Sequence, residues 1–365
     1  SILYIFNFKM KIFKKIIIII LLFIVILALF FIYAGTNKEF GRKFLHKNHS
    51  DQNYSGGDLY NYSGLNRFKE NRIRIPLENS TICNGSDMII KGDSFFNTGW
   101  DSSPVPNYLQ KISGKNIFYH STTGSEITPL EYLEKFSCRN GETRFFIWET
   151  IERNSITRVV DLESDFSNRS KKGTVSIWAK IKNNLFYQDD IEFFIKNNLF
   201  FRAISLWFKN LAFEWFGIID SKTPLYLDDP NMLFYENEIN FNKNKHKLSY
   251  IDKIANNIAK EADVIKDRYN LTLVFLIIPN KFSIYGEQIL GEDEHDDFIP
   301  KLQTALELRG VSYVDVYDAF KNYQREHPNE LLYYAGDTHY LPVGKKILID
   351  ELINAGIGLD SKVIE

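Results

Sequence analysis

The sequence predicts an α/β domain in which a parallel sheet is flanked by helices. Two observations predict it: short apolar segments typical of buried strands, and helical patterns that fall between them. Strands that alternate with helices favour a parallel sheet that is covered on its faces. We expect strands at residues 87–90, 142–148, 271–279 and from 312, and helices at 129–136, 250–267, 300–309 and from about 342.

Length and composition fit this class. The chain has 365 residues, of which 44% are hydrophobic, which suits one large domain or two small ones. The formal net charge is −2, and the lysines and arginines are scattered along the chain. A nucleic-acid-binding face would need clustered cations, so no nucleic-acid partner is expected.

The N-terminal part contains one long apolar stretch. Residues 16–34 carry no charge, and the run is long enough for a helix to cross a hydrocarbon core of about 30 Å. Lys11, Lys14 and Lys15 precede it, which suits a cytoplasmic N-terminus. A cleavable signal peptide is the alternative, although its apolar region is usually shorter. We expect a retained anchor over residues 1–36 in the inner (cytoplasmic) membrane, with the remainder periplasmic or extracellular.

The rest of the chain divides by composition. Residues 37–75 are polar and contain several glycines, which predicts a linker. Residues 76–365 are expected to form the catalytic domain, with an aromatic-rich insertion at about 160–245. The aromatic segment 198–218 inside this insertion predicts either a helix packed on the domain or a helix that binds a membrane surface or a partner.

The sequence contains two cysteines, Cys83 and Cys138. Two thiolates are too few to form a structural zinc site by themselves. In an extracytoplasmic domain they can pair as one disulfide, and the alternative is two unrelated buried thiols. No metal or cofactor is expected.

The stretch KGDSFF, residues 91–96, follows the first expected strand. A strand-to-helix turn at Gly92, Asp93 and Ser94 would expose the serine hydroxyl and direct backbone N–H groups toward a developing oxyanion. Gly92 would let the chain turn tightly, and Asp93 is expected to shape the turn through a hydrogen bond. Serine is a poor nucleophile unless a base lies within hydrogen-bond reach and is itself oriented.

His339 is the candidate base for Ser94. It lies in AGDTHYLPVG, two residues after Asp337 and just before the last expected helix. In an extended loop, residues two apart point the same way, so the carboxylate can hold one ring nitrogen while the other faces the serine. We expect the two loops to meet beyond the C-terminal ends of the strands, where sites lie in sheets of this kind.

These motifs resemble the SGNH (GDSL-type) hydrolase superfamily and, more narrowly, its alginate O-acetyltransferase-like branch. The resemblance covers residues 89–154 and 271–352. It includes GDSF, the Glu152-Arg153 pair after an apolar strand, and a Pro-x-Lys-x-x-x-Tyr segment at 279–285. In the alginate enzymes the Asp-x-His precedes the serine, whereas here the serine comes first, as in ordinary SGNH hydrolases. The resemblance implies a three-layer sandwich.

The resemblance also implies roles for single residues. Ser94 would take up the acyl group, His339 would be the general base, and Asp337 would orient His339. Arg153 would bind an anionic sugar or form a salt bridge at the strand end. The candidates for oxyanion and substrate binding are the Ser94 N–H, Gly124, Asn97, Arg153 and Tyr285. For Tyr285 and Lys281 the alternative to lining the cleft is that they cap the strand.

By this resemblance the chain is expected to be a membrane-anchored O-acetyltransferase that acts on a cell-envelope or secreted polysaccharide. Its acetyl groups would come from a separate multi-span membrane acyltransferase. An SGNH-type esterase or deacetylase of glycans or lipids is the alternative, because both reactions share the acyl-enzyme step. A scaffold that keeps the fold without the activity is the third interpretation.

Overall fold

The computed structural model describes residues 15–30, 33, 57–78, 83–120, 127–138, 145–160, 199–244, 246–290 and 297–357. The chain divides into two compact units, one made of residues 1–52 and 172–211, the other of residues 53–171 and 212–365. The second unit contains the central sheet and the described residues of the candidate site.

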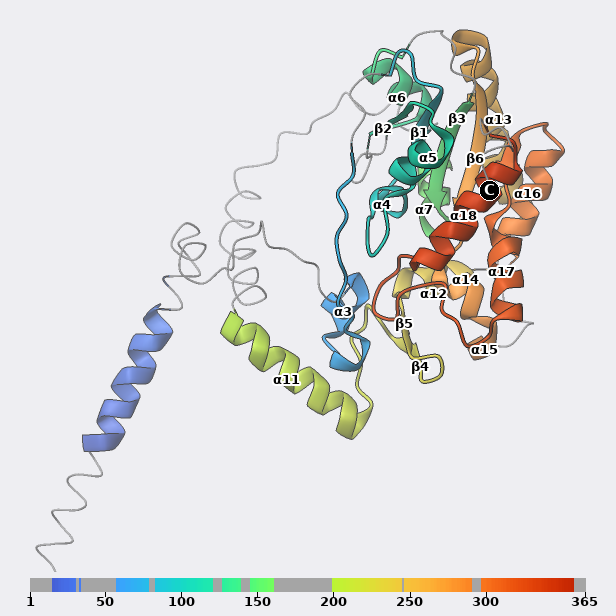
Figure 1. Ribbon diagram of the computed structural model, residues 1–365. Helices are drawn as coiled ribbons and strands as arrows, with labels where there is room; N and C mark the ends of the chain where they lie inside the picture. Colours follow the sequence, from blue (N-terminus) through green and yellow to red (C-terminus); the bar gives the residue numbers. More distant parts are fainter. Residues whose placement is uncertain are drawn as a thin grey trace, which may run out of the picture. The chain divides into compact units, whose positions relative to one another are not determined.

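A five-stranded parallel sheet forms the centre of the second unit, in the order β2-β1-β3-β6-β7 (Figure 1). The strands are β1 (Met88–Lys91), β2 (Ile117–Tyr119), β3 (Phe145–Ile151), β6 (Thr272–Ile278) and β7 (Ser312–Val314). The first four are buried along almost their whole length. Strands covered on both faces are continuous apolar runs, which is why β1, β3 and β6 stood out in the sequence, whereas the three-residue β2 was not predicted. The predicted parallel sheet is confirmed.

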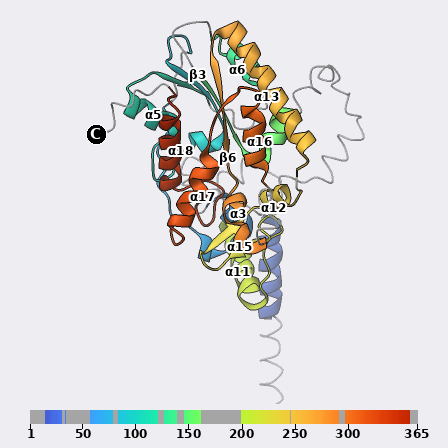
Figure 2. The same ribbon diagram turned by 90° about the vertical axis from the view of Figure 1, so that its right-hand side faces the viewer.

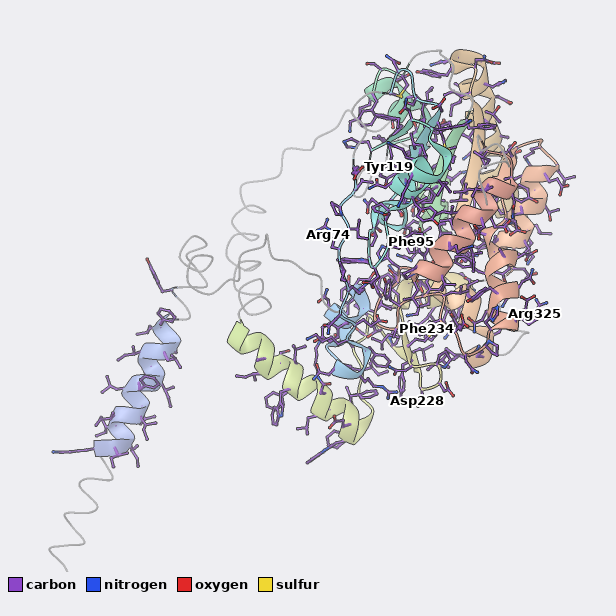
Figure 3. The ribbon with its side chains drawn as sticks, viewed as in Figure 1. Arg74, Phe95, Tyr119, Asp228, Phe234 and Arg325 are labelled. Carbon is purple, nitrogen blue, oxygen red and sulfur yellow. A yellow bond between two sulfur atoms is a disulfide. The ribbon has the colours of Figure 1, made fainter. Side chains whose placement is uncertain are left out.

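Helices cover both faces of the sheet (Figures 1 and 2). On one face lie α6 (Pro129–Lys135), α7 (Glu152–Val160), α13 (Leu248–Tyr269) and α16 (Phe298–Glu307). On the other lie α4 (Ser94–Asn97), α5 (Val105–Ser113), α17 (Val316–Glu326) and α18 (Pro342–Asn354). Side chains fill the space between these layers (Figure 3). Several shorter elements complete the unit. The hairpin β4 (Leu225–Leu227)–β5 (Met232–Phe234) and α12 (Glu236–Lys243) precede β6 in the chain, and α14 (Lys281–Tyr285) and α15 (Glu287–Leu290) follow it.

Helix positions follow the local sequence. α13 buries Ile251, Ile254, Ala255 and Ile258, the spacing of one helical face. α6 begins with a capping box between Thr128 and the side chain three residues later. These local signals explain why the predicted helices at 129–136, 250–267, 300–309 and from 342 are all present.

Part of the segment predicted as a linker is folded onto the domain. Residues 57–78 contain α3 (Asp58–Ser63) and the 3-10 helix η2 (Asn66–Phe68). Leu59, Leu65 and Phe68 are buried together with Leu233 in a small second core. The folding of residues 57–75 differs from the linker predicted at 37–75. The sequence did not show it, because the buried apolar residues of this segment are few and the residues they pack against are distant in the chain. Residues 37–56 lie outside the described residues.

The insertion predicted at about 160–245 is also partly integrated. Residues 161–198 lie outside the described residues. The hairpin β4–β5 and α12 pack into the domain, and Phe234 and Ile239 belong to its main core. α11 (Leu199–Phe216) forms the aromatic segment, on which Trp215 and Phe216 are exposed.

The predicted membrane anchor begins with a helix. Residues 15–30 are helical, and their large apolar side chains are exposed. Within the described ranges, no helix combines the length and apolar character that a bilayer span needs. Residues 31, 32 and 34 of the predicted span lie outside those ranges, so the anchor stays a prediction.

Cys83 and Cys138 form a disulfide, with their Cα atoms 5.3 Å apart. It links the segment that leads into β1 to the residues that follow α6. The sequence left this pairing open, and the structure decides it. The bond joins residues that are 55 positions apart.

We expect this disulfide to stabilise the domain, because closing a loop of this length lowers the entropy of the unfolded chain. Replacing both cysteines (Cys83→Ser with Cys138→Ser) should lower the free energy of unfolding by about 4 kcal/mol. Denaturant titration of the oxidised wild type and of the variant measures this difference. The reduced wild type is the control and should match the variant. Equal stability of the oxidised and reduced wild type would contradict the prediction.

Candidate active site

The turn after β1 carries Ser94. β1 ends at Lys91 while the neighbouring β3 continues further, so the turn lies beside Glu149 of β3. The Asp93 N–H donates to Glu149 Oε2 at 2.7 Å. A Cβ on Gly92 would lie 2.7 Å from the same oxygen. Glycine is therefore required here by the close approach of the buried carboxyl group.

Asp93 shapes the start of α4. Its Oδ1 accepts the Phe95 N–H at 2.9 Å, which caps the helix. Its Oδ2 accepts a hydrogen bond from Arg158 at 2.7 Å, and Arg158 also donates to Thr150 at 3.2 Å. Ser94 is thereby fixed at the first position of α4, where a backbone N–H has no carbonyl partner within the helix. These contacts agree with the structural role expected for Asp93.

The loop before α18 brings His339 to this turn. His339 Nε2 lies 2.9 Å from Ser94 Oγ, and His339 Nδ1 lies 2.6 Å from Asp337 Oδ1. Asp337 Oδ1 also accepts the His339 backbone N–H at 2.9 Å. The Phe95 ring stacks on the imidazole with centroids 4.5 Å apart. Two loops that are far apart in the sequence therefore meet as the sequence predicted.

Arg72 holds the other oxygen of Asp337. Its NH1 donates to Asp337 Oδ2 at 2.6 Å, and the two side chains are only 1% and 4% exposed. The guanidinium lies over the rings of Trp100 and Tyr334, 5.0 and 4.6 Å from their centroids. The Asp58 N–H donates to the same Oδ2 at 3.2 Å. Hydrogen bonds to both oxygens fix the carboxylate plane against the imidazole.

Further contacts hold the histidine loop, defined here as residues 334–339. The Asp58 carboxylate accepts the Thr338 N–H at 2.8 Å and the Thr338 hydroxyl at 2.5 Å. The Glu70 carboxylate accepts two backbone N–H groups of the loop at 2.9 and 3.2 Å. Lys281 is fully buried, and its Nζ donates to three carbonyl oxygens of the loop. The loop is therefore held by side chains from the N-terminal segment of the domain, Asp58 and Glu70, and by Lys281, which follows β6.

Neighbouring charges set the protonation states of the pair. Burial alone would raise the pKa of Asp337, but the charges and hydrogen bonds of His339 and Arg72 hold it well below its usual range. Burial would lower the pKa of His339, but the charge and hydrogen bond of Asp337 outweigh it and raise the pKa above 6.5. At neutral pH Asp337 is therefore ionised and stabilises a proton on His339.

Activity on an ester is expected to decline on the acid side with a midpoint above pH 6.5, because protonated His339 cannot accept the Ser94 proton. The measurement is kcat/KM for a simple acetyl ester between about pH 5 and about pH 9. The logarithm of kcat/KM should fall with a slope of one below the midpoint. A Ser94-dependent activity that stays constant down to about pH 5 would show that His339 is not the base.

Arg153, a predicted substrate-binding residue, lies near the triad. Its NH1 donates to Glu238 at 2.8 Å, and both side chains are largely buried. Its guanidinium lies 5.5 Å from the centroid of the Phe95 ring and 5.7 Å from that of Tyr235. The acid that pairs with it thus comes from α12, not from the strand end considered in the sequence.

The other predicted binding residues are placed differently. Tyr285 is fully buried, and its hydroxyl accepts the Leu332 N–H at 2.8 Å, which is a packing role and not the predicted contact with substrate. Asn97 is the last residue of α4, about one turn beyond Ser94. Gly124 lies outside the described residues. Of the predicted oxyanion donors, the backbone N–H of Ser94 is the one that lies in the described residues beside the hydroxyl.

Sequence reasoning missed Arg72, together with Asp58 and Glu70. Arginine and isoleucine alternate from Arg72 to Ile75, which indicates an extended segment. The segment does form an antiparallel bridge between Arg74 and Trp100, next to which the Ile75 N–H donates to the backbone carbonyl of residue 99. A period-2 pattern would place the isoleucines inside, yet Arg72 is buried and Ile73 is 73% exposed. The Arg72 side chain therefore lies on the buried face of the segment, where the alternating pattern would have placed the isoleucines.

One cluster of acidic and histidine side chains in the described ranges is close enough to hold a metal ion: Asp58, Asp337 and His339. Their oxygen and nitrogen atoms already bond to Thr338, Arg72 and each other. The buried Arg72 cation beside Asp337 also opposes a second positive charge at this place. These side chains fit a hydrogen-bonded triad better than a metal centre.

The fold and the site define a class: an α/β protein with a Ser-His-Asp arrangement suited to acyl transfer. His339 is within reach of the Ser94 proton as Ser94 Oγ attacks an ester carbonyl, and it can return that proton to the leaving alcohol. The acyl group then stays on Ser94 until water or a second alcohol takes it. Asp337 holds the imidazole ring and stabilises its cation.

Comparisons with known proteins give weak likenesses. No family model matches the chain, and no curated protein sequence is similar to it. Among solved structures, the acetylxylan esterase Axe2 from Geobacillus stearothermophilus matches 78% of this chain and 100% of its own, at 12% identity and a TM-score of 0.36. LAE5, an alpha/beta hydrolase from the metagenome of Lake Arreo in Spain, matches 77% of this chain and 99% of its own, at 12% identity and a TM-score of 0.35.

A protein from Parabacteroides merdae that is described as a GDSL-like lipase gives a similar result. It matches 77% of this chain and 98% of its own, at 10% identity and a TM-score of 0.36. Scores this low establish neither the family nor the reaction of this chain. The chemistry of the site has to be inferred from its own residues.

Proposed function

We propose that the chain is an SGNH-type serine enzyme that carries an acyl group on Ser94. The observation that supports this most strongly is the line of contacts from Ser94 Oγ to His339 at 2.9 Å and from His339 to Asp337 at 2.6 Å. A histidine with a purely structural role can be satisfied by many kinds of hydrogen-bond partner. His339 instead has a serine at the start of a helix on one ring nitrogen and an ionised, buried carboxylate on the other. This combination is what activates a serine.

Within that class we propose O-acetyl transfer to a polysaccharide acceptor. The support is the resemblance to the alginate O-acetyltransferase-like branch over residues 89–154 and 271–352. A multi-span membrane acyltransferase would supply the acetyl groups, as that resemblance implies. Hydrolysis is the competing outcome, because water and a sugar hydroxyl can both attack the same acyl-enzyme.

We place this reaction outside the cytoplasm, at the inner membrane. Disulfides persist in oxidising compartments, and Cys83 and Cys138 are paired. The uncharged stretch at residues 16–34, preceded by lysines, fits an anchor whose following domain is exported.

The test is to incubate the full chain with an activated acetyl ester, with and without glycan acceptors, and to follow acetate and acetylated glycan by mass spectrometry. Acetylated glycan above the level of a Ser94→Ala control would support transfer. Free acetate alone, at the same rate with every acceptor, would replace the transferase with an esterase. Donor consumption that does not depend on Ser94 would refute both.

A further inference from the structure

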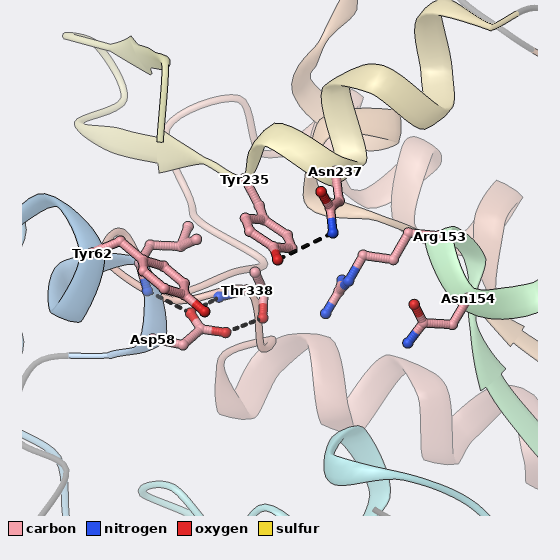
Figure 4. Close-up of a pocket in the computed structure, with 8 residues that line it drawn as sticks. Asp58, Tyr62, Arg153, Asn154, Tyr235, Asn237 and Thr338 are labelled. Carbon is pink, nitrogen blue, oxygen red and sulfur yellow. Dashed lines mark hydrogen bonds between the residues drawn. The ribbon is translucent and has the colours of Figure 1, made fainter. Parts of the chain in front are cut away.

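A polar pocket of about 280 Å³ lies beside the histidine loop (Figure 4). Its wall is built by parts of the domain that are far apart in the sequence. The side chains used below are Asp58 and Tyr62 of α3, Arg153 and Asn154 of α7, and Tyr235 and Asn237 at the start of α12. Thr338 of the histidine loop closes one side.

The pocket lies on the histidine side of the triad. Thr338, the neighbour of His339, lines it. The Phe95 ring stacks on His339 and also lies 5.5 Å from the guanidinium of Arg153, which reaches into the pocket. In acyl transfer by a Ser-His-Asp triad, the histidine exchanges its proton with the leaving or attacking alcohol. A group held in this pocket is therefore placed as the alcohol part of the ester, not as the acyl part.

The lining of the pocket is polar, with flat aromatic rings. The rings of Tyr62 and Tyr235 are parallel within 4°, with centroids 6.1 Å apart. The Asn237 amide donates to the Tyr235 hydroxyl at 3.1 Å, and Figure 4 shows the Arg153 guanidinium between Tyr235 and Asn154. An alkyl chain in this space would displace water from these amide, hydroxyl and guanidinium groups and offer no hydrogen bond in return, which is unfavourable. A ring that carries hydroxyl groups can satisfy them.

The charges of the pocket compensate each other. Arg153 is paired with Glu238 at 2.8 Å, and Asp58 faces the same space. Among the described side chains around the pocket, two cations, Arg153 and the buried Lys281, are thus set against these two acids. A sugar carboxylate would meet no net positive charge here and would approach Asp58. The lining favours an uncharged ring.

We propose that this pocket binds the alcohol part of the ester and that this part is a neutral, polyhydroxylated ring such as an uncharged sugar unit. The inference rests on the proposed function, since it assumes the proton exchange at His339. For a transferase the proposal concerns the alcohol that accepts the acyl group, and for an esterase the alcohol that is released. In both cases it disfavours lipid alcohols and anionic sugars. It also replaces the anionic sugar that Arg153 suggested in the sequence.

The test separates binding from chemistry by using the full chain with Ser94→Ala. Isothermal titration compares three probes: a neutral hexose oligosaccharide, the same oligosaccharide oxidised to carry carboxylates, and a medium-chain alkanol. The neutral oligosaccharide should bind at least about 10-fold more tightly than the other two, which is about 1.4 kcal/mol. Asn154→Ala and Asn237→Ala, each added to Ser94→Ala, should weaken its binding about 5-fold or more.

Asn244→Ala is the matched control, because Asn244 caps α12 and lines a different pocket. It should leave binding of the oligosaccharide unchanged. Tighter binding of the oxidised oligosaccharide or the alkanol, no binding of any probe, or equal loss in Asn244→Ala would overturn the proposal. Hydrolysis of a simple aryl acetate by the wild type tests the triad separately, so a failure of the proposed function is distinguished from a failure of the pocket.

Discussion

Replacing Ser94 with alanine is expected to lower kcat on an acetyl ester by about 10⁴-fold or more. In the proposed mechanism Ser94 Oγ attacks the carbonyl, and His339 Nε2 lies 2.9 Å from it. Without the hydroxyl no acyl-enzyme forms, and the remaining donors can only polarise the ester for attack by water. Steady-state kinetics on an activated acetyl ester measure the loss. Ser113→Ala is the control, because the Ser113 hydroxyl bonds within α5, and it should change kcat by less than about 2-fold.

The same mechanism predicts that the triad acts as a unit. His339→Ala should cost about as much as Ser94→Ala, and the double variant should be no slower than either single variant, because each change already removes the activated nucleophile. Losses that multiply in the double variant would mean that Ser94 and His339 act independently. Mass spectrometry after mixing with the ester should detect an acetyl group on the wild type and none on Ser94→Ala. Wild-type turnover without a trapped adduct, together with an active Ser94→Ala, would eliminate the serine mechanism.

Arg72→Met is expected to give the second-largest effect. Arg72 NH1 donates to Asp337 at 2.6 Å in a nearly inaccessible place, so its loss leaves a buried carboxylate without its cation. Breaking such a pair by removing one partner typically destabilises a fold by about 3–5 kcal/mol. We also expect kcat to fall about 10-fold or more, because the plane of Asp337 and the ring of His339 are no longer fixed. Denaturant titration and steady-state kinetics measure the two effects.

Arg72 is a positioning residue, and its role has a signature that loss of stability alone would not give. Removing the guanidinium removes a positive charge near the imidazole, so the pKa of His339 should rise and the acid limb of kcat/KM should move to higher pH. Arg72→Lys keeps the charge and should retain most of the wild-type limb. Arg268→Met, which removes a largely exposed cation 3.6 Å from Glu134, is the control and should change stability by less than about 1 kcal/mol. An unmoved acid limb in Arg72→Met would reduce Arg72 to a purely structural residue.

These predictions depend on residues 57–78 as much as on the two motifs that carry Ser94 and His339. Asp58, Glu70 and Arg72 all bond to the histidine loop from this segment. A domain cut at residue 76, as the composition suggested, would lose all three contacts. The folded unit that carries the candidate site therefore includes residues 58–72.

The sequence by itself predicted the layered architecture and the meeting of Ser94, His339 and Asp337. Buried parallel strands must be apolar on both faces, so β1, β3 and β6 are visible as continuous apolar runs. Parallel strands end at the same edge of a sheet, so we expected a serine after an early strand and a histidine before the last helix to meet there. Local pattern and topology together were enough for Ser94, His339 and Asp337.

The tertiary structure alone decided which polar groups face one another. Arg72 pairs with Asp337 across 265 positions, Arg153 pairs with Glu238 across 85, and Cys83 bonds to Cys138. A buried polar side chain is stable wherever it finds a partner, and the partner's place in the sequence leaves no periodic trace. For that reason the sequence showed the reacting groups, while the residues that hold them in place appeared only when the chain was folded.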